Sequence, residues 1–151
     1  MNQDNQHTSI ISINNDGSDS SYFTERNIRL QGSPARFLSE QIPAENFRFR
    51  TSDHRYSSEW HVAGDPTLLV ILTGSLQIEL RTGESRTFSA GELFIANDYL
   101  KQGIQFDNTI HGHRAKVLGN ENFSALHIKL EKRTDSSNHN TLSRTSSVKA
   151  K

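Results

Sequence analysis

The sequence predicts an all-β fold, either a sandwich or a barrel, on the strength of three observations. The segment Ser75–Leu80 alternates apolar and polar residues with the period of two that is typical of a half-buried strand. Glycines punctuate the apolar runs at intervals of about eight to twelve residues, which is the spacing of short strands joined by turns. No window has the periodicity of an amphipathic helix.

Further strands are expected on both sides of Ser75–Leu80. Before it, Phe47–Arg50 alternates in the same way, and Thr67–Leu72 is a continuous apolar run of the kind that is buried on both faces. After it, Ala115–Val117 alternates again. The last expected strand, Ser124–Leu130, places three apolar side chains on one face, those of Leu126, Ile128 and Leu130.

The distribution of aromatic residues predicts one domain between two polar ends. All eight Phe, all three Tyr and the single Trp fall between Tyr22 and Phe123. The ends are rich in Ser, Thr, Asn and Asp, and such segments do not bury enough apolar surface to offset their ordering entropy. We therefore expect a folded domain over residues 22–133, with disordered segments over 1–21 and 134–151.

Composition excludes several classes of protein. The chain of 151 residues has 17 basic and 17 acidic side chains, which argues against nucleic-acid binding through bulk positive charge. Without cysteine there is no disulfide, thiol nucleophile or thiolate zinc site. No apolar run is long enough to span a membrane, and the first residues lack the features of a signal peptide. We expect a soluble cytoplasmic protein without nucleic-acid or membrane partners.

The order of the central motifs resembles the cupin superfamily. In small single-domain cupins, a strand–Gly–strand unit is followed by a motif of the form F-x-x-G-[DE] and another apolar strand. The segments that carry the resemblance are Leu68–Leu72, Thr73-Gly74, Ser75–Leu80 and Phe88–Leu93, with Trp60-His61 upstream and Gly112–Arg114 downstream.

This resemblance implies a double-stranded β-helix, or jelly-roll barrel, with a pocket in its interior. It also implies a homodimer, because small cupins of this kind usually pair through edge strands near the N-terminus. The apolar residues that would form such an N-terminal arm are Ile28, Leu30, Phe37 and Leu38.

The first metal motif of the family is incomplete in this chain. Metal-binding cupins present two His separated by one residue, then a Glu seven residues before the turn glycine. Counted back from Gly74, the His pair falls on His61 and Ala63, and the Glu position falls on Thr67. Of the three ligands that the resemblance implies in the first half of the barrel, only His61 is present.

The second half offers a compensating pair, His111 and His113. If both point inward with Ala115 and Val117, they could join His61 in a three-imidazole site for Fe, Zn, Ni or Cu. Two other interpretations stay open: the same histidines line a metal-free pocket, or they are structural.

Three other polar residues are candidates for a role at the pocket. Glu59 shares the strand parity of His61, which makes it a candidate ligand or general base, or else an ordinary edge-strand charge. Arg114 has the planar fork that suits an anion, but alternation places it opposite His113. For His127, which shares a face with Ala125 and Lys129, we expect a solvent or interface position.

The sequence supports three hypotheses from different functional classes. The first is a small-molecule-binding, ligand-sensing cupin whose pocket is formed by His61, His111, His113 and Glu59. The alternative is a metal-dependent cupin enzyme, an oxygenase, isomerase or lyase, that uses the three histidines. The third is a structural protein that dimerises through its barrel. No hydrolase elbow, phosphate loop or dinucleotide fingerprint is present in the sequence.

Overall fold

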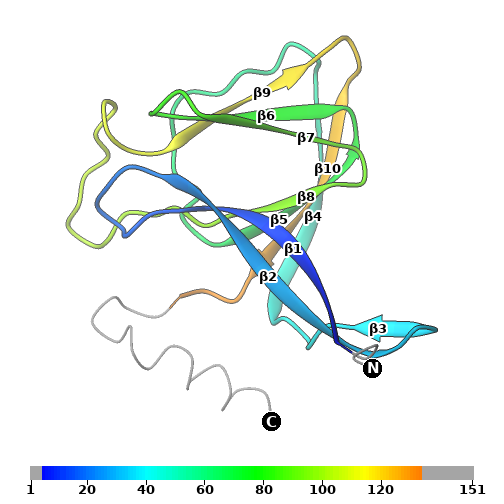
Figure 1. Cartoon of the computed structure of the whole chain (residues 1–151). Helices are drawn as coiled ribbons and strands as arrows, with labels where there is room; N and C mark the ends of the chain where they lie inside the picture. The colour runs from blue at the N-terminus through cyan, green and yellow to red at the C-terminus, as the bar shows by residue number, and fades with distance from the viewer. Residues whose placement is uncertain (1–4, 134–151) are drawn as a thin grey trace.

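The computed structural model describes residues 5–133, and all of the regular structure in this range is β (Figure 1). No helix in this range could span a membrane. The predicted disordered tail at 134–151 lies outside the described residues. The strands are β1 (Asn5–Asn14), β2 (Tyr22–Ser33), β3 (Arg36–Leu38), β4 (Ala44–Ser52), β5 (Thr67–Thr73), β6 (Ser75–Leu80), β7 (Ser85–Ser89), β8 (Leu93–Ala96), β9 (His113–Leu118) and β10 (Phe123–Leu130).

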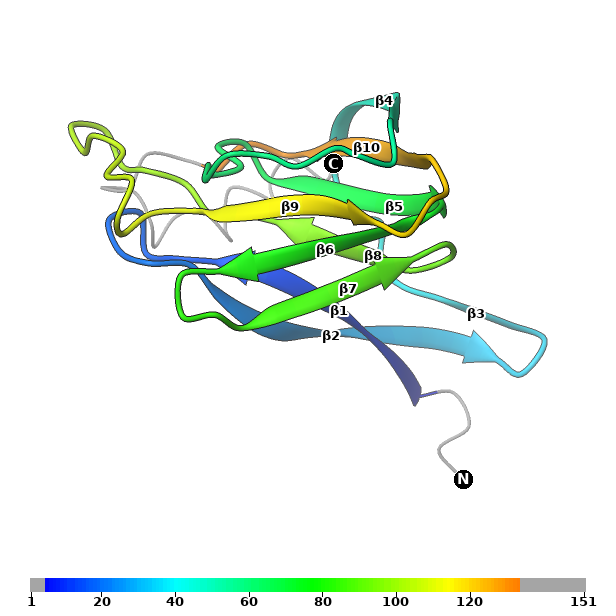
Figure 2. The ribbon, with the colours of Figure 1, turned by 90° about the horizontal axis from the view of Figure 1, so that it is seen from above.

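The strands form two sheets that lie face to face (Figure 2). The larger sheet has seven strands in the order β3-β2-β1-β8-β5-β10-β4, and the smaller has three in the order β7-β6-β9. The expected all-β class is confirmed. The hydrogen-bonded strand pairs within residues 5–133 form two separate sheets, and they do not show the predicted closed barrel.

The hydrophobic core lies between the sheets. It is built from the inward side chains that strict alternation selects: Leu76, Ile78 and Leu80 of β6 are each about 1% exposed. Ala115 and Val117 of the neighbouring strand β9 lie beside them on the same inward face, while Arg114 and Lys116 are exposed on the outer side, as the sequence predicts.

The prediction of a disordered segment at 1–21 is wrong for residues 5–21, because Asn5–Asn14 form β1 inside the larger sheet. This strand is antiparallel to β2 along its whole length and parallel to β8 from Ile11 to Ile13. Ile13 is fully buried in the core. Pairing with β2 along its length, and with β8 over Ile11–Ile13, gives hydrogen-bond partners to the backbone of a strand whose own sequence is mostly polar.

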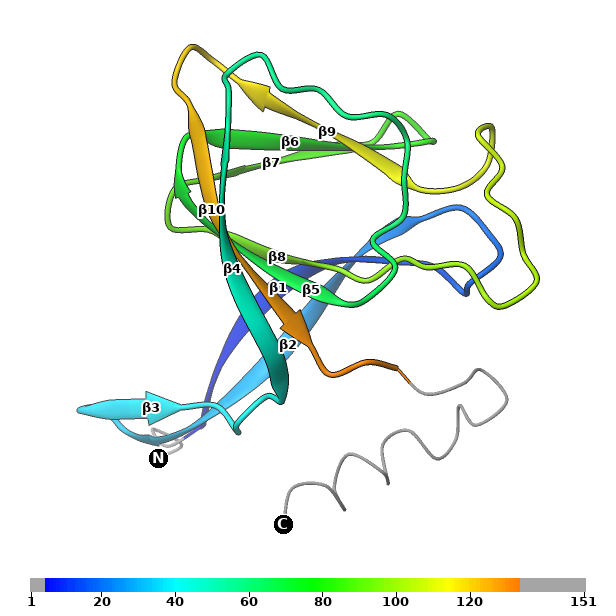
Figure 3. The same ribbon diagram turned by 180° about the vertical axis from the view of Figure 1, so that it is seen from behind.

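The segment between β4 and β5 leaves the larger sheet, runs along the edge of the smaller sheet and returns (Figure 3). Its backbone runs beside β9, with hydrogen bonds from Ser58 N to Ala115 O (2.8 Å) and from Val117 N to Tyr56 O (3.0 Å). It ends in an isolated antiparallel bridge between His61 and His113, whose N–H and C=O groups bond reciprocally at 2.9 Å. This bridge brings together two histidines that are 52 residues apart in the chain.

Candidate functional site

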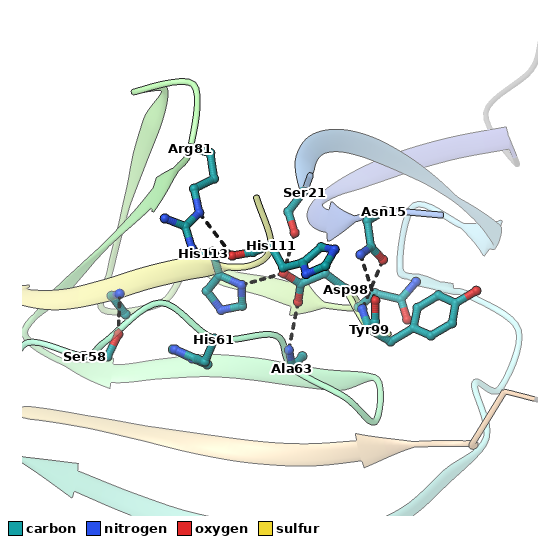
Figure 4. Close-up of polar contacts among 12 residues, drawn as sticks. Asn15, Ser21, Ser58, His61, Ala63, Arg81, Asp98, Tyr99, His111 and His113 are labelled. Atoms are coloured by element: carbon teal, nitrogen blue, oxygen red, sulfur yellow. Dashed lines mark hydrogen bonds and ion pairs between the residues drawn. The ribbon is translucent and has the colours of Figure 1, made fainter. Parts of the chain in front are cut away.

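A buried aspartate orients His113. Asp98, 0% exposed, follows β8 and accepts a hydrogen bond from His113 Nδ1 at 2.8 Å (Figure 4). The carboxylate also accepts from Ser21 Oγ (2.6 Å) and from the backbone N–H of Ala63 (2.9 Å). Burial alone would raise the pKa of Asp98, but the hydrogen bonds from His113, Ser21 and Ala63 outweigh it and hold that pKa below its usual value.

His61 is also oriented through its Nδ1 atom, in this case by a backbone carbonyl group. Its Nδ1 lies 2.8 Å from the carbonyl oxygen of Glu59, which only accepts, so Nδ1 carries the proton. The rings of His61 and His113 are 4.6 Å apart between centroids, and Figure 4 shows His113 between Asp98 and His61. Partial burial lowers the pKa of His61, the Glu59 hydrogen bond opposes this shift, and His113 adds to it.

Both imidazoles line a cavity of about 180 Å³ between the two sheets. With Nδ1 of each ring donating to a protein acceptor, the neutral rings carry their lone pairs on Nε2, for which no partner is found among residues 5–133. The remaining wall includes Tyr56 and the apolar side chains of Leu69, Leu76, Ile78 and Phe94. Polar groups that converge beside apolar side chains in a cavity are typical of a ligand site.

A larger depression lies outside the core, between β1 and β7. It measures about 540 Å³, but its ionisable side chains are only Arg86 and Glu92. The smaller cavity between the sheets is therefore the candidate functional site, because the oriented histidines meet there.

The structure does not bring His111 into the cavity. Its Nδ1 accepts from the backbone N–H of Asp107 (2.8 Å), and its Nε2 donates to Ser18 O (3.0 Å). Both ring nitrogens are therefore used to hold the loop before β9 against the turn between β1 and β2. His111 is buried, and in this arrangement its ring has no lone pair for a metal or a ligand.

The side chain of Glu59 also lies outside the cavity. Glu59 is exposed and does not line the cavity wall. It acts through its backbone instead, because its carbonyl oxygen orients His61. Arg114 points away from the cavity as predicted and pairs with Glu79 at 2.8 Å.

His127 is part of the cavity wall, contrary to the outward or interface position expected from the sequence. In the register of β10, it lies opposite Arg48 of β4 and Leu69 of β5, on the inward face. Its Nε2 is buried without a hydrogen-bond partner among the described residues. Burial first, then the charges of Arg50, Lys129 and Arg48, lower the pKa of His127 to about 4.

We expect the substitution His127→Leu to stabilise the empty protein by roughly 1–2 kcal/mol at pH 7, since it removes an unpartnered buried polar atom. The gain should widen as pH falls from 6.5 toward 4, because the unfolded wild-type chain takes up a proton there that the folded chain does not. Urea unfolding at several pH values measures both effects. The control is His7→Leu, at an exposed position of β1; equal behaviour of the two variants would contradict the buried position of His127.

The donor set does not complete the metal site that the cupin resemblance implies. No group of three or more His, Cys, Asp or Glu in residues 5–133 is placed to hold a metal ion. Ala63 and Thr67, which stand at the missing ligand positions, do line the cavity, but neither supplies an imidazole or a carboxylate. Within residues 5–133, His61 and His113 lie side by side with Nε2 free, whereas His127, which also lines the cavity, is not placed to complete a three-ligand group with them.

Sequence comparison finds no matching protein-family model and no matching curated protein. Among solved structures, a conserved protein of unknown function from Streptococcus pyogenes is 14% identical, over 65% of this chain and 72% of the other, with a TM-score of 0.40. A cupin-2 domain protein from Shewanella frigidimarina is 20% identical (60% and 78% covered, TM-score 0.38). The Cnp3 cupin domain of Schizosaccharomyces pombe is 12% identical (85% and 88% covered, TM-score 0.40).

Cupin domains are thus among the solved structures to which this chain is similar. TM-scores of 0.40 and below carry no argument about the activity of this protein. The chemistry of the site follows from its own residues.

One element of the site, Asp98, is absent from the sequence prediction, and a second, His127, is expected there at a solvent or interface position and lines the cavity instead. Asp98 lies two residues after the end of the apolar strand β8, and an isolated acidic residue just beyond a buried strand is the only signal that could have marked it. Its partners Ser21 and His113 are remote in the chain, so no local pattern connects the three. His127 and Lys129 carry the period-two signal, but that signal does not say which face is the inner one.

Proposed function

We propose that this chain is a small-molecule-binding, ligand-sensing protein of the cupin type, with its two sheets as the walls of a jelly-roll barrel and its ligand in the cavity between them. The observation that supports this proposal is the pair His61 and His113. Each ring is held by a hydrogen bond at Nδ1, and each leaves Nε2 free at the cavity.

Two fixed acceptors beside apolar walls favour a ligand with both a donor group and an apolar part. Hydroxyl or N–H groups of the ligand can donate to His61 Nε2 and His113 Nε2, while Leu76 and Phe94 cover its apolar portion. The structural-protein hypothesis needs neither a cavity nor oriented imidazoles, and so explains less of this arrangement.

A thermal-shift screen of small sugars, organic acids and aromatic compounds tests the proposal. At least one compound class should raise the melting temperature of the wild type. The substitution His61→Gln should lower the affinity for the best compound about fivefold or more, because it removes a hydrogen bond. The control His54→Gln, outside the cavity, should leave its affinity unchanged. A screen without any stabilising compound, or equal losses in both variants, would contradict a ligand site at His61.

The metal-dependent enzyme remains the second candidate, and one observation favours it. An imidazole whose Nδ1–H donates to a carboxylate or a carbonyl, as in His113 with Asp98 and His61 with Glu59, is the arrangement common in metal-ligating histidines. Metal analysis of untagged protein, wild type and His113→Ala, tests it. One equivalent of Fe, Zn, Ni or Cu in the wild type, lost in the variant, would favour the metal-dependent enzyme. A protein that stays metal-free after reconstitution would contradict the enzyme and favour the metal-free ligand-binding protein.

The predicted homodimer is also a proposal, and an exposed apolar sheet face supports it. On the outer side of the larger sheet, Phe49 pairs with Leu126 and Phe47 with Ile128. Phe47 is 64% and Phe49 is 71% exposed, and both belong to β4, the edge strand of the sheet. Exposed apolar patches of this kind mark interaction sites. A second copy, related by a two-fold axis, would cover the patch with its own identical face.

The proposed arm residues lie on strands at the other edge of the same sheet. Ile28 and Leu30 of β2 are half-buried, and Leu38 of β3 is 55% exposed. Figure 1 shows this end of the larger sheet, β3 and the adjoining part of β2, projecting beyond the region where the two sheets face each other. In the proposed dimer, this end of β2 and β3 would contact the second copy.

We expect the double substitution Phe47→Ser and Phe49→Ser to convert the dimer to a monomer at micromolar concentration, because it removes the largest exposed apolar side chains of the patch. Light scattering coupled to size-exclusion chromatography measures the mass. The control is Ile104→Ser, an exposed apolar position on the loop before β9. A wild type that is monomeric at high concentration would contradict the dimer.

A further inference from the structure

One wall of the cavity is basic. The inward positions of β4 and β10 that line it carry Arg50, His127 and Lys129. The register accounts for this: Arg50 lies opposite Ala125, and alternation along β10 brings His127 and Lys129 to the same face as Ala125. Lys129 also lies opposite Thr67 of β5, to whose Oγ1 its Nζ donates at 2.9 Å.

No acidic side chain in the described range balances these groups at the cavity. The lining contains neither Asp nor Glu, and none of the ion pairs within residues 5–133 includes Arg50 or Lys129. Asp98 lies behind His113 and is occupied by three hydrogen bonds.

The basic groups are held in place but remain available. The Arg50 guanidinium lies over the rings of Tyr56 (4.7 Å) and Phe123 (5.3 Å), and its Nε donates to Ser52 Oγ (3.0 Å). These contacts orient a cation without neutralising it. Between Arg50 and Lys129 along the wall lies His127, whose Nε2 is buried without a partner.

The protonation of His127 is consistent with a cavity that lacks an anion. Arg48 and Arg50 of β4 and Lys129 of β10 face it, whereas β5 contributes only the apolar Leu69 opposite it. Burial and these cations lower its pKa to about 4. A bound anion would reverse the electrostatic part of this shift and allow Nε2 to donate a charged hydrogen bond.

We infer that the ligand of this cavity is a small organic anion, such as a monocarboxylate, whose charged group faces the wall formed by Arg50, His127 and Lys129. Its apolar part packs on Leu69 and Phe94, and a donor group at its far end reaches His61 and His113 on the other side. The inference rests on the proposed function and names the ligand class for that site. Since a cavity of about 150 Å³ is known to hold benzene, a ligand of roughly six to ten heavy atoms fits here.

Calorimetric titration with matched pairs tests the inference: benzoate against benzamide, and isobutyrate against isobutyramide, on the full chain at pH 7. Each pair has the same shape and differs in charge. We expect the carboxylates to bind about tenfold tighter than the amides, with the preference falling as salt is added.

Variants locate the effect on the basic wall. Lys129→Met should lower the carboxylate affinity about tenfold and leave the amide affinity unchanged, while Lys116→Met, on the outer side of β9, should change neither. Because Lys129 also bonds Thr67, Arg50→Gln serves as a second variant, with the exposed Arg36→Gln as its control.

The outcomes separate this inference from the proposed function. Amides that bind as tightly as carboxylates would overturn the anion preference and leave a ligand site in the cavity. Equal losses in Lys129→Met and Lys116→Met would overturn the role of the basic wall. Absence of binding for every carboxylate and amide, at concentrations up to the millimolar range, would contradict the anion inference. If the broader thermal-shift screen also found no ligand, the proposed function would fail with it.

Discussion

The substitution Gly112→Ala is expected to destabilise the protein by about 3 kcal/mol or more and to abolish ligand binding. Gly112 has a φ of +88°, and a Cβ there would lie 2.4 Å from His61 O and 2.7 Å from its carbonyl carbon. Those atoms belong to the bridge that pairs His61 with His113, so the new methyl group must either break the bridge or displace His61. Urea unfolding measures the loss of stability, and calorimetric titration with benzoate measures the loss of binding.

Gly103→Ala is the matched control for this prediction. Gly103 has the same φ of +88°, but a Cβ there meets nothing within 4 Å. The control therefore retains only the backbone penalty of a left-handed alanine, about 1 kcal/mol. If the two variants were equally stable, the close approach of Gly112 to His61 would not exist in the folded protein.

The substitution Asp98→Asn is expected to destabilise the protein by about 2–4 kcal/mol at pH 7, with Asp98→Ala at the upper end of that range. The carboxylate accepts from three donors, those of His113, Ser21 and Ala63. An amide has one acceptor oxygen, so at least one donor faces an NH₂ group. If that group faces His113, the ring must change tautomer, and Nε2 becomes a donor at the cavity.

The pH dependence of this destabilisation has a definite sign. The pKa of Asp98 lies below its unfolded value of 3.8, so its contribution is fully present above that pH and is lost as pH falls through the folded pKa. The difference between wild type and Asp98→Asn should therefore shrink below about pH 4. The control is Asp53→Asn, an exposed aspartate bonded to Arg55, which should keep nearly wild-type stability. Equal losses in both variants would contradict the buried role of Asp98.

Local patterns predict most of the strands around the cavity. Thr67–Leu72, Ser75–Leu80 and Ser124–Leu130 all lie within or match β5, β6 and β10. The prediction of β5 rests on a continuous apolar run, and the predictions of β6 and β10 rest on alternation that leaves one face of each strand apolar. The position of His113 on the inward face of β9 follows from the same pattern.

Other features depend on contacts that a linear pattern does not contain. β1 is mostly polar, and it is a strand because β2 and β8 supply its hydrogen bonds. His127 faces inward because the apolar side of β10, with Leu126 and Ile128, lies on the outer face of the sheet beside the exposed Phe47 and Phe49. The sequence predicts which residues share a face, whereas the tertiary arrangement decides which face is inside.

The candidate site shows the same division. The cupin resemblance makes His61 a candidate ligand and strand alternation adds His113, and the structure brings the centroids of these two rings to 4.6 Å from each other. His111 was expected beside them, but hydrogen bonds to Asp107 and Ser18 hold it in the loop. Whether a histidine serves the cavity or the fold is set by the partner of each ring nitrogen, and those partners come from distant segments.

The ligand site between the two sheets is tested most directly by a long-range ¹H–¹⁵N spectrum of the histidine rings in untagged protein at pH 8, recorded with and without benzoate. We expect His61 and His113 to carry the proton on Nδ1, and His111 to carry it on Nε2. Benzoate should shift the Nε2 signals of His61 and His113 and leave those of His111 unchanged. A spectrum in which His61 and His113 carry the proton on Nε2, or in which benzoate and every compound from the thermal-shift screen leave both rings unshifted, would contradict a ligand site at these two histidines.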